Sequence, residues 1–441
     1  MSGVALALLK KGFSISGSDP IKNDRITELK KNGALVFDNQ SAKNINLITK
    51  KFADKKIHII ISSAIKNDNE ELTFCIKKNL NIKHRSEILS SIMKSYKSIA
   101  VTGTHGKTST STFLTTLLSI CTKNTSSIIG GIMPYYSSNT FLKDTKYLVT
   151  EIDESDGTTC NYAPYLGIIN NIDFDHCDFY SDMKDLISSF KKFGSNSEQL
   201  LTNYDCKITQ KNINSNYKWS IKEKKGINFS MIPKEVNQGH TIADYYENEK
   251  IIRTIKIPVP GLHNLSNITA AISACRILNI KKENIIENIN YLQLPKKRFE
   301  LRGEIYDRKI IDDYAHHPNE IKATIDLARL FINTNKQRLV VIFQPHRYSR
   351  VSKFISEFVN ELSKADLIII TDIYSAGETN SQNINSQTIV NKIYNLNKNV
   401  MFINNNYEIA KNFLNITNKG DLILNMGAGN CHNLWSLLQS K

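Results

Sequence analysis

The sequence predicts an α/β protein in which largely parallel sheets carry helices on both faces. Short apolar runs of strand type alternate with segments of helical spacing along most of the chain. Several of these runs are followed at once by polar, acidic or glycine residues, as happens where strands of a doubly wound sheet end and bind a ligand. A chain of 441 residues has room for two to four such domains.

The composition is that of an ordinary globular protein, with 41% apolar and 22% charged residues. The chain shows neither an apolar run of membrane-spanning length nor a cleavable leader, so we expect a cytoplasmic protein that does not engage a membrane. Its seven cysteines are scattered and form no Cys-x-x-Cys pair, which favours reduced thiols over a disulfide framework or a zinc ribbon.

The formal net charge of +15 raises the question of a nucleic-acid partner. The lysines, however, occur in ones and twos, and there is no basic helix and no patch of interleaved basic and aromatic residues. We therefore expect most lysines to be solvated surface residues, no nucleic-acid partner, and a positive cleft that serves an anionic substrate.

The first hundred residues alternate between helices and strands. The elements expected here are a helix at 4–9, a strand at 13–19, a helix at 25–31 and a buried parallel strand at 57–61. Asp19, Ser62 and Ser63 stand at strand ends and are candidate substrate contacts, although a simple polar turn would explain each of them equally well.

The most informative stretch is a strand, a glycine turn and a helix start between residues 98 and 118. Ile99 and Val101 lie in the strand, and apolar residues recur at helical spacing from residue 113 onward. The turn has two residues between its glycines, where the common phosphate loop has four, so a plain glycine turn is the alternative. The flanking strand and helix favour a nucleotide site, whose candidates are Gly103, Thr104, His105, Gly106, Lys107, Thr108 and Ser109.

Two strand ends supply possible metal ligands near this loop. A buried strand at 147–150 leads into four acids within residues 151–156, beginning with Glu151, and Thr108 adds a hydroxyl. A carboxylate beside a phosphate loop is where Mg²⁺ would be held, while a solvated acidic turn is the alternative. A second strand at 166–172 ends near His176, which is a candidate metal ligand or, more simply, a capped loop histidine.

Later segments continue the same pattern. Residues 195–258 are strand-like and polar and indicate no chemistry. A helix begins after Pro260, and His263, Asn264 and Asn267 in its first turns could contact a base edge or could simply cap the helix. Strands expected near 310, at 339–343, at 367–370 and at 422–424 end in polar, basic or glycine residues, which predicts a second doubly wound sheet.

Taken together, these segments resemble the Mur ligases. The residues that carry the resemblance lie at 103–108, 151–156, 175–176, 261–264, 312–318, 343–350 and 372–378. They follow the family's order over nearly the whole chain. The acidic run at 151–156 and the last two segments are similar to those of the alanine-adding member, whereas the tripeptide-recycling relative usually departs at the position of Ser155 and at Gln-Pro-His-Arg.

The resemblance implies three domains. Residues 1–96 would form a Rossmann-like domain that binds the UDP substrate, 97–294 a P-loop domain that binds ATP, and 295–441 a Rossmann-like C-terminal domain for the amino acid. The family begins with a strand and a Gly-x-Gly-Gly-x-Gly loop ahead of its Met-Ser-Gly, and this chain begins at Met1. We expect a start codon upstream of the assigned one, with a true truncation as the alternative.

The resemblance also assigns roles to individual residues. Lys107 matches the phosphate-binding lysine, and Thr108, Glu151 and His176 match metal ligands. His263, Asn264, Asn267 and Asp313 match the ATP side. Arg298 matches a catalytic basic residue, and His316, Arg347 and Arg350 match positions that face the sugar nucleotide and its carboxylate, where His316 could also remove a proton from the incoming amine.

The implied activity is the ATP-dependent joining of L-alanine to the lactyl carboxylate of UDP-N-acetylmuramate through an acyl phosphate, during peptidoglycan precursor synthesis. It would need ATP and Mg²⁺, or Mn²⁺, and we expect a monomer or weak homodimer. One alternative is another Mur ligase, adding D-glutamate or recycling a tripeptide. A second is a basic, nucleic-acid-associated P-loop ATPase.

Overall fold

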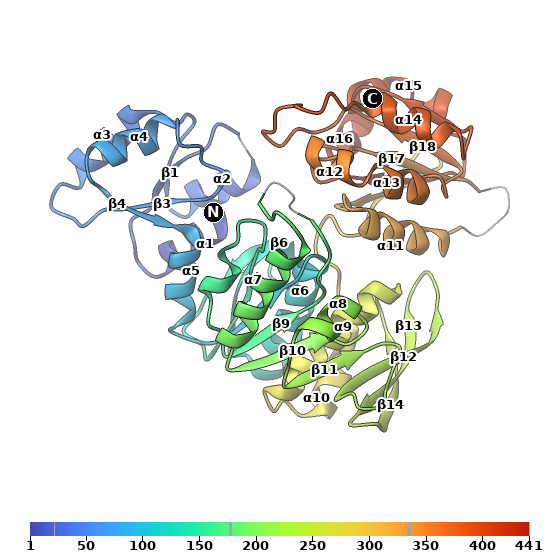
Figure 1. The fold of residues 1–441 in the computed structure, drawn as a ribbon, viewed down its shortest axis with the longest axis horizontal. Coiled ribbons are helices and arrows are strands. Elements are labelled where there is room, and N and C mark those ends of the chain that lie inside the picture. Colours follow the sequence, from blue (N-terminus) through green and yellow to red (C-terminus); the bar gives the residue numbers. More distant parts are fainter. Residues whose placement is uncertain (22, 176–178, 333–336, 441) are drawn as a thin grey trace.

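The computed structural model describes all residues except 22, 176–178, 333–336 and 441, and it contains three α/β domains (Figure 1). The N-terminal and C-terminal domains both lie against the central domain, which is drawn in green and yellow in Figure 1. The predicted α/β class is confirmed. Within the part of the chain that the structure describes, no helix is long and apolar enough to cross a membrane.

The N-terminal domain holds two small parallel sheets, β1–β2 and β3–β4, instead of the single sheet that the alternation predicts. Because each strand has a neighbour on one side only, β3 is part-exposed and not the buried strand expected at 57–61. The strand expected at 13–19 pairs over just three residues. The elements are α1 Ser2–Lys10, β1 Ser16–Ser18, α2 Asp24–Lys31, β2 Leu35–Phe37, α3 Ala42–Lys51, β3 His58–Ile61, α4 Glu70–Lys77, β4 Asn81–His84 and α5 Arg85–Met93.

Two helices of this domain anchor it to the central domain. Val4 and Ala7 of α1 and Ile92 of α5 are buried in one apolar cluster with Ala100 and Leu148 of the central sheet. The N-terminal strands are thereby held next to the central sheet even though they do not pair with it.

The central domain is built on a sheet whose described strands run in the order β14-β13-β12-β11-β10-β9-β5-β8-β6-β7. Strand β5 lies between β8 and β9 and is parallel to both, so the ends of these three strands meet at one edge. The elements are β5 Lys97–Thr102, α6 Lys107–Thr122, β6 Thr125–Met133, β7 Ser138–Phe141, β8 Tyr147–Glu151, β9 Leu166–Ile169, α7 Met183–Asn196, β10 Gln199–Asn203, α8 Lys207–Asn212, β11 Tyr217–Ser220, β12 Phe229–Val236, β13 Thr241–Glu247, β14 Lys250–Ile257, α9 Leu262–Ile277 and α10 Lys282–Glu287.

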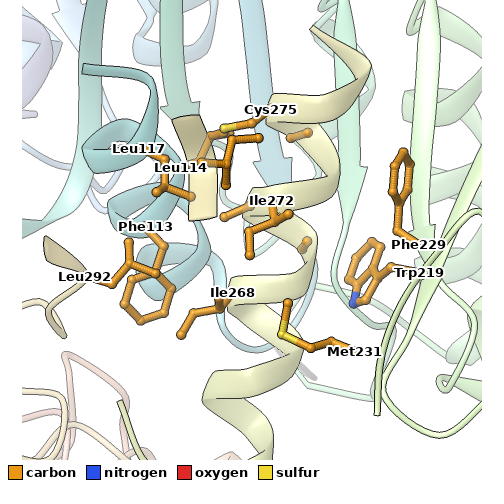
Figure 2. Packing of buried hydrophobic residues seen from close by; sticks show 14 of the residues in the cluster. Phe113, Leu114, Leu117, Trp219, Phe229, Met231, Ile268, Ile272, Cys275 and Leu292 are labelled. Carbon is orange, nitrogen blue, oxygen red and sulfur yellow. The ribbon is translucent and has the colours of Figure 1, made fainter. Parts of the chain in front are cut away.

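Helices α6 and α9 pack side by side in the main core of this domain. Figure 2 shows Phe113 and Leu117 on α6, Ile272 on the adjacent α9, and Trp219 and Met231 on the far side of α9. All five side chains are buried. Because both helices begin at the edge where β5 ends, this core fixes the position of the two helix starts.

The C-terminal domain has a sheet of described strands in the order β15-β16-β20-β17-β18-β19, with apolar clusters on both faces. Helix α11 lies on the side of this domain that faces the central domain (Figure 1). The elements are β15 Glu300–Ile305, β16 Arg308–Asp313, α11 Pro318–Arg329, β17 Leu339–Phe343, α12 Tyr348–Lys353, α13 Ile355–Leu362, β18 Leu367–Ile370, α14 Ser386–Tyr394, β19 Val400–Phe402, α15 Asn406–Ile416, β20 Leu422–Met426 and α16 Asn433–Gln439.

Candidate active site between the central and C-terminal domains

The predicted phosphate loop connects β5 to α6. Gly103 and Gly106 have φ values of +125° and +79°, which favour glycine. A Cβ on Gly106 would lie 2.4 Å from Oδ1 of Asn267, so the start of α9 packs directly against the loop. Helix α6 begins at Lys107 directly after the loop, and no side chain caps its N-terminus, as suits a phosphate site.

The end of β9 holds the loop in place. The backbone N–H of His105 donates to Oδ1 of Asn171 at 2.8 Å, and the Asn170 amide donates to the His105 carbonyl at 3.2 Å. The Thr104 hydroxyl donates to the carbonyl of Asp173 and accepts from its N–H, at 3.0 and 2.9 Å. These hydrogen bonds hold Thr104 and His105 against the residues that follow β9, and none of them requires a bound ligand.

Lys107 lies over the loop among carboxylates. Its Nζ is 2.8 Å from Oε2 of Glu154 and 2.8 Å from the Gly103 carbonyl. Burial by itself would lower the pKa of Lys107, but the charges of Glu154, Asp153 and Glu151 outweigh it and raise the pKa well above its usual value. Lys107 is therefore a permanent cation at the start of α6.

Thr108 and Glu151 are brought together as the metal prediction requires. The Thr108 hydroxyl lies 2.9 and 3.1 Å from the two oxygens of Glu151, and one of these oxygens also accepts from the Gly130 N–H at 2.9 Å. These are hard oxygen donors, of the kind that Mg²⁺ prefers. The third predicted ligand, His176, lies outside the described residues.

Another group of potential ligands surrounds the loop histidine. One donor atom each from His105, Asp173 and His317 lie within 4.8 Å of one another. The Asn319 amide also donates to Oδ2 of Asp173, which already lies 3.2 Å from Nε2 of His105. This cluster joins the central domain to the N-terminal end of α11.

His316 is positioned as a neutral acceptor. Its Nδ1 lies 2.9 Å from the Tyr314 carbonyl, which requires a proton on Nδ1 and leaves the lone pair on Nε2. Burial lowers the pKa of His316 to about 4. Burial likewise lowers the pKa of His346 to about 3, and its Nδ1 lies 3.1 Å from Nη1 of Arg350.

Arg350 forms a buried ion pair that spans the two domains. Its Nε and Nη2 lie 3.0 Å from Oδ1 and Oδ2 of Asp175, and the side chains are only 4% and 5% exposed. The guanidinium predicted to meet a substrate carboxylate thus has a carboxylate partner from the central domain. Its contact with substrate stays a prediction.

The other C-terminal candidates lie at one edge of their sheet, where β15 starts and where β16 and β17 end. Arg298 lies over the ring of Tyr314 at 5.1 Å and is 3.9 Å from Oε1 of Glu320. Asp313 accepts from the N–H groups of Phe299 and Ala315 at 2.7 Å each. Arg347, with a φ of +68°, is the N-cap residue directly before α12, and its guanidinium is 3.4 Å from Glu378.

On the N-terminal side, Ser63 reaches the acidic run of the central domain. Its hydroxyl donates to Oδ2 of Asp156 at 2.8 Å, and Arg85 approaches the same oxygen at 3.1 Å. Ser62 and Asp19 lie at the ends of β3 and β1 and are part-exposed, and Asp19 caps its own turn through the Ile21 N–H. Their substrate contacts stay predictions.

The residues predicted for the adenine side differ in exposure. His263 is exposed at the start of α9, whereas the Asn264 amide is buried and donates to the Pro260 carbonyl at 2.8 Å. Asn267 accepts from the Thr110 hydroxyl at 3.2 Å beside the phosphate loop. The simpler alternative of helix capping is not what the structure shows, because Gly261 is the N-cap of α9 and no side chain caps it; Asn264 instead bonds a backbone carbonyl.

Sequence reasoning assigned no role to Asp173 or Glu320, two carboxylates that lie where the central and C-terminal domains meet. Glu320 occupies the third position of α11, and its Oε2 accepts from the His316 N–H at 3.1 Å. An acid three positions into a helix that begins with proline is a local capping signal, so its place at the helix start could have been predicted. The contact of Glu320 with His105 of the phosphate loop could not have been predicted in this way.

We expect acid to destabilise the C-terminal domain between about pH 6.5 and 4. His316 is neutral when folded, but the unfolded chain binds a proton below its ordinary pKa of about 6.5, so stability falls as the pH falls through this window. The loss from His316 alone is up to about 3 kcal/mol. Thermal melting at pH 7 and pH 5 measures this loss of stability. If the His316→Gln variant loses as much stability between the two pH values as the wild type, protonation of His316 is not its cause.

The phosphate loop with its carboxylates, together with Arg298, Arg347 and Arg350, is typical of an ATP-dependent enzyme built from three α/β domains. Family models described as the Mur ligase family catalytic domain, the Mur ligase middle domain, and the Mur ligase glutamate ligase domain match residues 1–97, 101–275 and 297–429. The chain belongs to the Mur ligase family, as its motifs predicted.

Two curated relatives and two solved structures illustrate this likeness. A UDP-N-acetylmuramate–L-alanine ligase of Prochlorococcus marinus subsp. pastoris is 59% identical, with 100% of this chain and 95% of that protein covered. One of a Synechococcus species is 37% identical, with 100% and 96% covered. The UDP-N-acetylmuramate-alanine ligase structure from Thermotoga maritima has a TM-score of 0.84 at 25% identity, with 100% and 96% covered. A murein peptide ligase of Psychrobacter arcticus shares the fold, with a TM-score of 0.73 at 19% identity and 100% and 96% covered.

Proposed function

We propose that this chain uses ATP to join L-alanine to the lactyl carboxylate of UDP-N-acetylmuramate, in peptidoglycan precursor synthesis. The observation that carries the proposal is the 59% identity, over the whole chain, to a relative named for this reaction. The geometry of the phosphate loop and of the facing C-terminal residues supports it.

The reaction has two steps. The lactyl carboxylate attacks the γ-phosphorus of ATP, which gives an acyl phosphate and ADP. The neutral amine of alanine then attacks the acyl carbon, and phosphate leaves from the tetrahedral intermediate with its electron pair. Phosphoryl transfer depends on positioning and charge neutralisation, which the Lys107 ammonium and the N-terminus of α6 supply on the ATP side.

His316 is suited to receive the proton that the attacking amine loses. It is neutral, its Nδ1–H is oriented by the Tyr314 carbonyl, and its Nε2 carries the lone pair. With a pKa of about 4 it is a weak base, so it acts as a transient acceptor that passes the proton on. Arg298 and Arg347, at the same edge of the C-terminal sheet, are suited to substrate oxygens.

Mg²⁺ is the metal that the described ligands fit best, and Mn²⁺ accepts the same donors. Thr108 and Glu151 would hold it through oxygen, and His176 is the further ligand that the family resemblance predicts. When bound, such an ion neutralises charge on the nucleotide phosphates.

The test is phosphate release from ATP and UDP-N-acetylmuramate with Mg²⁺ and one amino acid at a time. We expect turnover with L-alanine and none with D-glutamate. Release with D-glutamate alone would assign the chain to another Mur ligase activity, and stimulation by nucleic acid without an amino acid would indicate the P-loop ATPase alternative.

We further propose that the protein acts in the cytoplasm, as a monomer or weak homodimer, without a nucleic-acid or membrane partner. The dispersed positive charge supports the absence of a nucleic-acid partner. Size-exclusion chromatography with light scattering measures the oligomeric state, and a stable tetramer would contradict the proposal.

A further inference from the structure

The proposed reaction leaves the side chain of His105 without a role. This imidazole belongs to the phosphate loop, yet it lies against the C-terminal domain. Its Nε2 is 3.2 Å from Oδ2 of Asp173, and its Nδ1 is 3.2 Å from Oε1 of Glu320. Asp173 belongs to the central domain, whereas Glu320 lies in the first turn of α11, 215 residues further along the chain.

The two carboxylates that contact the two ring nitrogens identify the protonation state of His105. A carboxylate only accepts hydrogen bonds, so both nitrogens must donate and the ring must be an imidazolium. Burial alone would lower the pKa of His105, but the hydrogen bonds and charges of Asp173 and Glu320 raise it to about 9.

Both carboxylates are themselves held by other groups. Asp173 is bonded through its backbone to Thr104 and through its side chain to Asn319. Glu320 accepts from the His316 N–H at 3.1 Å. The bridge therefore has little freedom at either end.

Among the described residues, the further charged or titratable groups next to this bridge are His317, His316 and Arg298 of the C-terminal domain, together with Asp175 of the central domain, whose charge acts to raise the pKa of His317. The ring of His317 lies 4.7 Å from the ring of His105, and burial together with the charge of His105 lowers the pKa of His317. Arg298 and Nδ1 of His316 lie 3.9 and 3.3 Å from the Glu320 carboxylate. His105 itself loses its charge near pH 9.

We propose that His105 is a positioning residue whose imidazolium couples the docking of α11 to the conformation of the phosphate loop. The bond to Glu320 forms only when the C-terminal domain is docked, so docking favours the loop geometry seen here. By linkage, any ligand that orders the loop favours docking to the same extent. The inference rests on the proposed function only in that ADP release is one of its readouts.

The test compares Glu320→Gln and His105→Gln with wild-type enzyme. The control is Asp326→Asn, because Asp326 lies on the same helix with its side chain 56% exposed in an ion pair with Lys322. Hydrogen exchange of residues 103–108 is measured in the full chain at pH 7, together with kcat and KM for ATP at saturating alanine.

We expect Glu320→Gln to accelerate hydrogen exchange in the loop by about 10-fold or more. This factor corresponds to the stabilisation that is lost when a hydrogen bond to a charged group is weakened. Asp326→Asn should leave it unchanged. His105→Gln and the double variant should match Glu320→Gln within about twofold, because one bridge is lost in each case. In wild-type enzyme the corrected exchange rate should rise as the pH passes about 9, and this rise should be absent from His105→Gln.

Three results would overturn the coupling. The first is equal loop exchange in Glu320→Gln and Asp326→Asn, and the second is additive effects in the double variant. The third is tight binding of one equivalent of Zn²⁺, with proton release, that is lost in His317→Ala, which would make the cluster a metal site. If wild-type enzyme releases no ADP with alanine while the exchange results hold, the proposed function fails and the coupling stands.

Discussion

Replacing Lys107 with methionine is expected to reduce alanine-dependent ADP formation by roughly three orders of magnitude. The ammonium lies at the N-terminus of α6 and its charge is permanent, so methionine keeps the length of the side chain but removes the cation that would neutralise phosphate oxygens. Losses of about 10²–10³-fold are typical when one preorganised donor to developing charge is removed. The measurement is single-turnover ADP formation at saturating ATP.

The same change also deprives the buried Glu154 carboxylate of its ammonium partner, which can destabilise the fold by about 3–5 kcal/mol. The double variant Lys107→Met/Glu154→Gln separates the two effects, because it should recover thermal stability without recovering activity. Lys97→Met, at the opposite end of β5 and over the ring of Tyr165, is the control that should retain both. Near-normal ADP formation by Lys107→Met would refute the assignment.

The parts of the site that were predictable from sequence are those encoded locally. Residues 97–122 carry the strand, the glycines and the helix in one continuous stretch, and the structure has them in that order. Glu151 was predicted beside Thr108 because parallel strand ends meet at one edge, and their side chains do meet. The resemblance then added roles that no spacing alone could supply.

The contacts between domains could not be predicted in this way. No periodicity places Glu320 against His105, or Ser63 against Asp156, because the residues are 215 and 93 positions apart. The N-terminal region shows a further limit. Alternating helices and strands predicted one sheet there, but alternation does not determine which strands pair, and two separate sheets formed.

Breaking the Arg350–Asp175 pair is expected to destabilise the docked C-terminal domain by about 3–5 kcal/mol, which is typical when one partner of a buried ion pair is removed. Both side chains are about 95% buried, so Arg350→Met leaves a carboxylate that water cannot easily reach. The comparison is Arg329→Met. Arg329 also pairs with an aspartate, Asp366, but these side chains are 36% and 38% exposed, and such pairs contribute about 0.2–1 kcal/mol.

The shift in the thermal or denaturant-induced transition without substrate isolates this effect from any role of Arg350 in binding. The double variant Arg350→Met/Asp175→Leu should lose less than either single variant, because two apolar side chains pack better there than a methionine beside a buried carboxylate that has lost its arginine. If Arg350→Met destabilises the protein no more than Arg329→Met, the Arg350–Asp175 pair contributes nothing to domain docking. The Arg350 guanidinium can then turn toward a substrate carboxylate without loss of stability. A large cost that the double variant relieves would instead mean that Arg350 meets substrate only in exchange for Asp175, so that substrate binding and domain docking compete for one guanidinium.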